Sequence, residues 1–144
     1  MNGTMTDIRQ AIAAAITSRV ADIQVSPWML SNPTPPAAHV FPSQVTYHQA
    51  FGDGFETWEF TLQVFVSENA GDVGSQQILD RYLARTGASS IKAALEADVT
   101  LGGVVSDLTV TQASGYRQYM TQGRANVLGA EWTINVIPAD EEDS

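Results

Sequence analysis

Cysteine is absent from this chain of 144 residues, and its absence excludes several kinds of site. Without a thiol the protein can form no disulfide, use no thiolate nucleophile and build no cysteine-based zinc site. The only histidines, His39 and His48, lie in segments expected to be extended or looped, and they lack the spacing of metal ligands. We interpret both histidines as incidental, and we expect no metal and no cofactor.

Positive charge is also scarce, because seven Lys and Arg residues stand against sixteen Asp and Glu, for a formal net charge of −9. The basic residues are spread along the sequence rather than clustered, which argues against strong free binding to nucleic acid. Four acidic residues lie in the last five positions, so residues 139–144 are predicted to form a solvated, disordered tail. A tail that repels DNA or docks on a basic partner is the functional alternative.

Long apolar runs and catalytic motifs are missing as well. The N-terminal stretch is interrupted by polar residues and lacks the basic start and cleavage site of a signal peptide, and no run reaches the ~20 residues of a membrane span. The sequence has no GxSxG elbow and no phosphate-binding glycine loop, and its carboxylate pairs flank polar stretches. We therefore predict that the protein is not an enzyme and has no catalytic residue.

The sequence does contain enough apolar residues for a core, at 44% hydrophobic and 16% charged, and residues 1–138 are predicted to form one domain. Apolar residues at three- and four-residue steps predict a first helix capped by Thr6 or Asp7. Five prolines between residues 27 and 42 then forbid central strand positions, so short edge strands or an extended arm are expected there. Residues 56–67 have a strong period-two alternation, which predicts a strand with one buried face.

The second half of the chain predicts two helices followed by two strands. A helix is expected over residues 71–86 with Gly87 as its stop, and a shorter one from Ser90 to Ala97, capped by Ser89 or Ser90. Alternating residues then predict a strand around Leu108 and a closing strand over residues 128–136. This order predicts an α+β fold, a mainly antiparallel sheet with its helices packed on one face.

Two sets of residues are candidates for contact with a partner. Phe51 and Phe55 flank Asp53 in a Gly-Asp-Gly turn, expected to be a hairpin loop, and apolar side chains at a loop tip are not easily buried by their own domain. Tyr116 and Tyr119 lie in a predicted bend between the last two strands. For both sets, partner contact and folding back onto the sheet remain alternatives.

One long segment carries a family resemblance. The residues ALEADVTLGGVVSDLTVTQ, followed by LGAEWTINVI, resemble the C-terminal half of tail terminator and related head-to-tail connector (neck) proteins of long-tailed bacteriophages. The family pattern there is a helix, a glycine-bearing turn into a strand, a bend and a final alternating strand. The first half is similar in kind, with an N-terminal helix, a Pro-rich extended segment and a strand that precedes a helix. The similarity spans roughly residues 7–138.

The resemblance implies a structural virion protein, the tail terminator, whose subunits close into a ring, typically a hexamer. Such a ring caps the tail tube and joins it to the head-side connector. The implied partners are further copies of the chain, the tail tube protein and a head-side neck protein, with DNA only passing through the channel and no membrane. Assembly in the host cytoplasm and a place at the head-tail junction of the virion follow. Two alternatives stay open: another neck component (a head- or tail-completion protein), or a small ligand-binding or enzymatic cytoplasmic domain.

Overall fold

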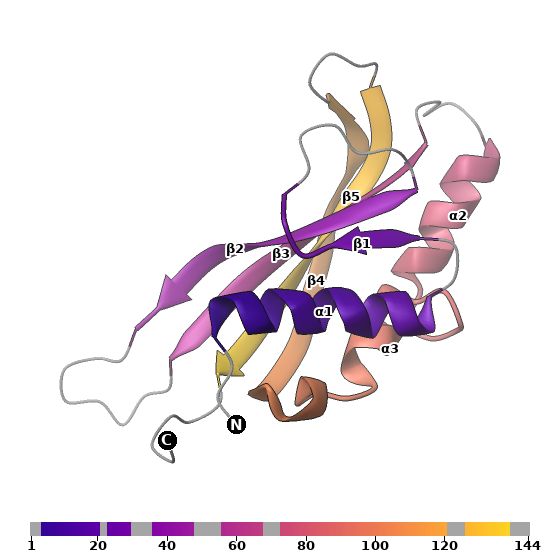
Figure 1. Cartoon of the computed structure of the whole chain (residues 1–144). Coiled ribbons are helices and arrows are strands. Elements are labelled where there is room, and N and C mark those ends of the chain that lie inside the picture. Colours follow the sequence, from indigo (N-terminus) through magenta and orange to yellow (C-terminus); the bar gives the residue numbers. More distant parts are fainter. Residues whose placement is uncertain are drawn as a thin grey trace.

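A computed structural model describes residues 4–20, 23–29, 36–47, 56–67, 73–120 and 126–138. The expected contact residues Phe51, Asp53 and Phe55, His48 and the acidic tail lie outside this described part. The elements follow in this order (Figure 1): α1 (Met5–Arg19), β1 (Gln24–Ser26), β2 (Ala37–Thr46), β3 (Thr57–Ser67), α2 (Val73–Leu83), α3 (Ile91–Glu96), a 3₁₀ turn (Leu101–Gly103), β4 (Val105–Met120) and β5 (Asn126–Pro138).

The five strands form one mixed sheet in the order β1-β2-β3-β5-β4. Only the short β1 runs parallel to its neighbour β2, and the pairs β2-β3, β3-β5 and β4-β5 are antiparallel. All three helices contribute residues to the same buried cluster as one face of the sheet. The predicted α+β fold with a mainly antiparallel sheet is therefore confirmed.

The core follows from the alternation in the two central strands. Phe60, Leu62 and Val64 of β3 are fully buried, and their register partners on β5 are also apolar and buried. Burying one such side chain contributes about 1.5–3 kcal/mol relative to leaving it in water. Because alternate residues of a strand point to opposite faces, this pattern fixes which face of the sheet the helices cover.

The first helix begins earlier than predicted. Its N-cap is Thr4, and neither Thr6 nor Asp7 caps it as expected. The Thr4 hydroxyl accepts a hydrogen bond from the Asp7 amide, and the Asp7 carboxylate accepts one from the Thr4 amide, both at 3.1 Å. This reciprocal capping box needs an acidic or amide side chain three residues after the cap, which Thr4 has in Asp7.

Proline does not divide the second strand as predicted. Residues expected as separate extended pieces form the single strand β2, which runs through Pro42 with a break in register between Pro42 and Gln44. The strand tolerates this proline because β1 pairs only with residues 37–39 of β2. Within the described residues Pro42 therefore has a partner strand on the β3 side alone, and a proline at an edge can direct its missing N–H away from the ladder.

The predicted bend at Tyr116 and Tyr119 is also wrong, because both residues belong to β4, which continues to Met120. The register of β4 with β5 shifts between Ser114 and Arg117, and Gly115 within this break has a φ of +68°. A glycine at positive φ is typical of a bulge, which bends and twists a strand without ending it. The segment that the sequence analysis interpreted as a bend therefore contains a bulge inside one long strand.

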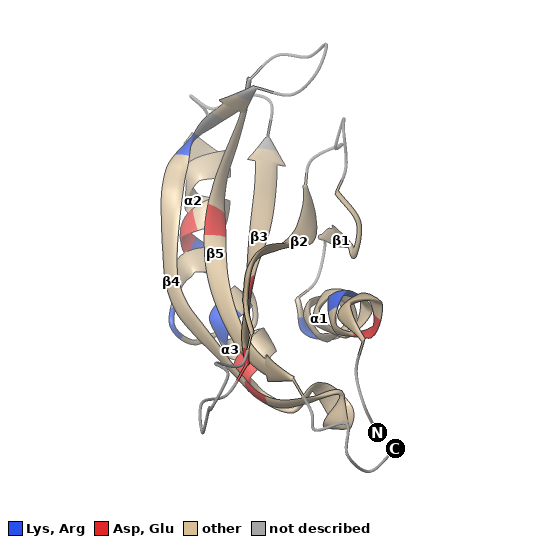
Figure 2. Ribbon diagram, turned by 90° about the vertical axis from the view of Figure 1, so that its left-hand side faces the viewer, with Lys and Arg blue, Asp and Glu red and all other residues tan. Residues whose placement is uncertain are grey.

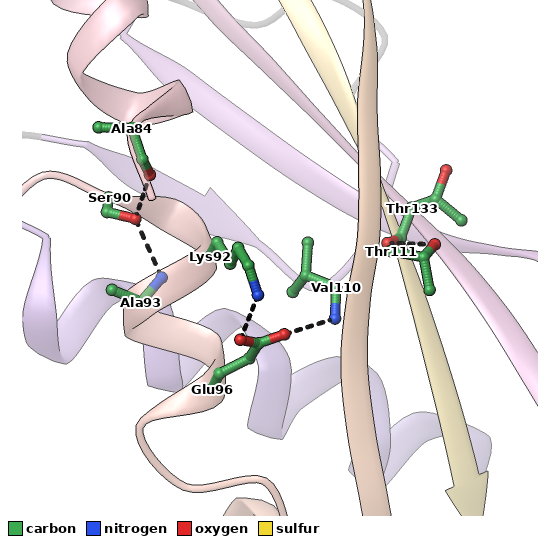
Figure 3. Close-up of polar contacts among 8 residues, drawn as sticks. All are labelled: Ala84, Ser90, Lys92, Ala93, Glu96, Val110, Thr111 and Thr133. Atoms are coloured by element: carbon green, nitrogen blue, oxygen red, sulfur yellow. Dashed lines mark hydrogen bonds and ion pairs between the residues drawn. The ribbon is translucent and has the colours of Figure 1, made fainter. Parts of the chain in front are cut away.

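The corner between α2 and α3 depends on Ser90. Helix α2 ends at Leu83, before the predicted stop at Gly87. The Ser90 hydroxyl donates to the carbonyl of Ala84 at 2.5 Å and accepts from the Ala93 amide at 3.0 Å (Figure 3). Ser90 thus caps α3, as one of the two predicted alternatives had it, and also satisfies a carbonyl just beyond the end of α2.

Candidate functional site

The first set of predicted contact residues comes from the segment between β2 and β3. Strands β2 and β3 are antiparallel partners up to the pair Thr46 and Thr57. The two strands therefore form a hairpin, as the sequence predicts, and Phe51, Asp53 and Phe55 lie between them in the sequence. Their role in partner contact stays a prediction.

Tyr116 is exposed over 43% of its surface and joins β4 to α2. Its hydroxyl lies 3.3 Å from the carbonyl of Gln76 and 3.2 Å from a carboxylate oxygen of Asp80. Partial burial, together with the nearby charge of Asp80, raises the pKa of Tyr116 above its ordinary value. The phenol therefore stays protonated at neutral pH and presents an exposed ring at this edge of the sheet.

Tyr119 is exposed over only 8% of its surface and packs against its own sheet. With Phe65 and Val127 it forms a second, small apolar cluster, in which the rings of Tyr119 and Phe65 meet edge to face at 5.7 Å. The Tyr119 hydroxyl donates to the Gly115 carbonyl at 2.7 Å, and the guanidinium of Arg117 lies over the ring at 4.2 Å. Of the two tyrosines, Tyr116 is the one that a partner can reach.

The hydroxyl of Tyr119 also explains the glycine in the β4 bulge. A Cβ at residue 115 would overlap this hydroxyl, so a side chain there would displace the phenol, and the positive φ of residue 115 also favours glycine. Burial raises the pKa of Tyr119, and the charge of Glu131 acts in the same direction. The phenol is thus kept neutral and bound to the backbone.

A chain of polar side chains crosses the sheet on the face that carries this second cluster. His39 Nε2 lies 2.6 Å from Gln63 Oε1, and Gln63 Nε2 donates to the carboxylate of Glu131 at 2.6 Å. Because Gln63 donates to Glu131 through its nitrogen, its oxygen is left to accept the Nε2 proton of His39. The three residues lie on β2, β3 and β5, and the chain links three neighbouring strands.

The surroundings of His39 favour the neutral ring. The side chain is 3% exposed, and the rings of Phe41 and Phe65 meet it edge to face at 5.8 and 5.5 Å. Burial lowers the pKa of His39, and the charge of Arg9 lowers it further, against the hydrogen bond to Gln63, which raises it. Gln63 separates this imidazole from Glu131, so the two groups form no directly bonded acid-base pair.

The described residues provide no group of three or more His, Asp or Glu that could hold a metal ion. Within the same part of the chain, no helix has the length and hydropathy that a membrane crossing requires.

No protein-family model matches this chain, and no curated protein matches it significantly. The function is therefore inferred from the resemblance of the sequence and from the elements and surfaces of the chain itself.

The sequence analysis interpreted His39 as incidental, although one signal of its burial was present. Phe65 interrupts the polar side of the alternating segment in β3, which indicates that part of the second sheet face is also covered.

Proposed function

We propose that this protein is a structural subunit of a phage tail, the tail terminator, which forms a ring at the end of the tail tube. The observation that carries the proposal is the order of elements in the segment that bears the family resemblance. Residues 90–138 form a capped helix, a glycine-bearing turn and two long antiparallel strands, in the order that the resemblance implies. The N-terminal helix and the β2-β3 hairpin that precede this segment also support the proposal.

The shape of the sheet suits a ring. A closed ring is built from head-to-tail contacts, in which one surface of a subunit meets a different surface of the next. The strand order leaves β1 and part of β2 at one edge of the sheet and β4 at the other, so the two edges differ in sequence and in direction. The proposed partners are other copies of the chain, the tail tube protein and a head-side connector, at the head-tail junction of the virion.

The charge of the chain fits a channel that DNA passes through. With a net charge of −9, the subunit repels phosphate more than it attracts it. A ring with this balance lets DNA move without holding it. A structure of the ring with a basic channel wall would contradict this part of the proposal.

The test is to add the purified protein to tail tube protein as the tube polymerises and to measure tube lengths by electron microscopy. We expect shorter tubes with the protein bound at one end. Changing Phe51→Ser and Phe55→Ser together is expected to abolish capping if the hairpin connection contacts the tube. The matched control is Met29→Ser, which removes an apolar side chain from another exposed position and leaves capping unchanged.

The outcomes separate the alternatives. Tubes of unchanged length, together with binding to a head-side connector, would contradict the terminator and support another neck component. Tubes of unchanged length with neither partner bound would contradict a place in the neck altogether and leave the small ligand-binding or enzymatic domain.

A further inference from the structure

The basic residues of this chain form no cluster in the sequence, but one long part of the chain has none. No lysine or arginine occurs between Arg19 and Arg81, whereas seven acidic residues do. From Arg81 to Arg124 the balance reverses, with five basic residues against three acidic ones. A division of this length gives the two parts of one chain opposite net charge.

The fold places the strands of these two parts at opposite ends of the sheet. Strands β1, β2 and β3 come from the acidic part and lie on one side of the strand order, and β4 lies at the other end. Figure 2 shows no blue segment on β1, β2 or β3, whereas blue segments occur on the side of α2, α3 and β4. Apart from the cations of α1, the described basic residues belong to this second side.

We name the acidic end the β2-β3 surface, formed by Ser43, Tyr47, Glu56 and Glu59. It adjoins the part of β2 that lies beyond the end of β1, where the described residues supply no further strand. The Glu59 carboxylate accepts a hydrogen bond from the Ser43 hydroxyl at 3.0 Å, and Glu56 accepts one from the indole N–H of Trp58 at 2.9 Å. Both donors are neutral groups, so these hydrogen bonds bring no positive charge to either carboxylate. Tyr47 beside them is 69% exposed.

We name the basic end the α2-α3 corner, formed by Arg81 at the end of α2 and Arg85 just beyond it. Both side chains are exposed. Within the described residues the single ion pair joins Lys92 to Glu96 (Figure 3), so neither arginine of the corner is paired. The bonds of Ser90 hold this corner in place against α3.

Resting on the ring function proposed above, we propose that the β2-β3 surface of one copy docks on the α2-α3 corner of the next. Unlike charges meet in this arrangement, and the two surfaces belong to different elements of the subunit, one to the strands β2 and β3 and the other to the end of α2, as a head-to-tail contact requires. Charged residues at such a contact choose the partner surface and its register. The exposed Tyr47 supplies an aromatic side chain of the kind that anchors interfaces.

Charge reversal in two separate chains tests the pairing. We expect Glu59→Arg alone and Arg85→Glu alone each to weaken self-association about tenfold or more, as sedimentation measures it, because like charges then meet. When the two variants are mixed, copies can alternate so that unlike charges meet at every contact, and association is expected to return. Asp107→Arg, the same charge change at an exposed position on β4, is the matched control and should leave association unchanged.

The absence of cysteine provides a second test that does not depend on strong association. We expect a mixture of the Gln44→Cys and Thr86→Cys variants, oxidised at high protein concentration, to give a disulfide-linked dimer. Neither variant should cross-link efficiently to itself, because the two positions belong to different surfaces. Far-UV circular dichroism of each variant confirms that the fold is kept.

Two results would overturn the proposal. One is cross-linking in the single-variant samples but not in the mixture, which indicates a symmetric contact. The other is an absence of cross-linking in every sample. If the wild-type chain still caps tail tubes in that case, the proposed function stands and only this contact is wrong. If the mixture cross-links but the wild-type chain has no effect on tubes, the contact between copies stands and the proposed terminator function is wrong.

Discussion

Replacing Gly129 by alanine should force apart the two central strands of the sheet. Gly129 lies on β5 opposite Phe65 of β3, beside the break in register between Phe65 and Ser67. A Cβ at this position would overlap the carbonyl oxygen of Val64 and lie 3.2 Å from Cδ1 of Phe65. The overlapping oxygen belongs to the backbone of β3, so no rotation of a side chain can relieve the contact.

The expected cost follows from this geometry. Inserting extra atoms into a well-packed site costs about 1–3 kcal/mol, and we expect the upper half of this range because the obstacle is backbone. For a domain of this size a loss of ~2–3 kcal/mol lowers the melting temperature by roughly 6–9 °C. Gly87→Ala is the matched control, because Gly87 has a φ of +111° and no atom within 4 Å of the added Cβ. Its expected cost is only about 1 kcal/mol, from backbone strain.

Urea unfolding, followed by tryptophan fluorescence and by far-UV circular dichroism, measures both variants. The slope of the transition should stay that of the wild type, so that the shift in midpoint reports stability alone. A Gly129→Ala variant within about 0.5 kcal/mol of the wild type would refute the steric argument, since surface substitutions that neither meet an obstacle nor strain the backbone fall in that range. A larger loss in Gly87→Ala than in Gly129→Ala would refute it too.

Two further predictions concern buried polar groups. Because burial lowers the pKa of His39 below its ordinary value of 6.5, folding favours the neutral ring, and stability is lost as the pH falls from 6.5 towards the lowered pKa of the folded state. Between pH 7 and pH 5, the free energy of unfolding measured in urea should fall less in His39→Gln than in the wild type. If His39 is the source of this pH dependence, His48→Gln should lose as much stability as the wild type does. Ser90→Ala removes the cap of α3 and leaves the Ala84 carbonyl unbonded, for an expected loss of about 1–2 kcal/mol. Ser89→Ala should cost less than about 0.5 kcal/mol, and equal losses in the two serine variants would contradict the role of Ser90.

The elements that the sequence predicted well are those decided by near neighbours along the chain. Strands β3 and β5 were predicted from the alternation of apolar and polar residues. Helix α3 was predicted from a serine cap before an apolar turn. Pro42 was misjudged because its place depends on where β1 ends, which no local pattern records. The segment around Gly115 was predicted to be a bend because a glycine occurs both in turns and in bulges, and only the pairing of β4 with β5 distinguishes the two.

The candidate contact residues show the same division. The sequence marked Tyr116 and Tyr119 equally, and only the packing distinguishes the exposed ring of Tyr116 from the buried ring of Tyr119. His39 looked incidental because its bonding partner Gln63 lies on another strand, 24 positions away in the sequence. Side chains that meet across strands have no fixed spacing along the chain.

By itself the sequence determined the fold class, the buried face of the central strands and the division of charge, because periodicity, composition and charge are properties of the chain. Only the tertiary structure decided that the acidic and basic parts lie at opposite ends of one sheet, because strand order depends on pairing between distant segments. The same pairing buried Tyr119 and joined His39 to Glu131 through Gln63. Long-range contacts have no local signal, and the proposed contact between copies depends on them.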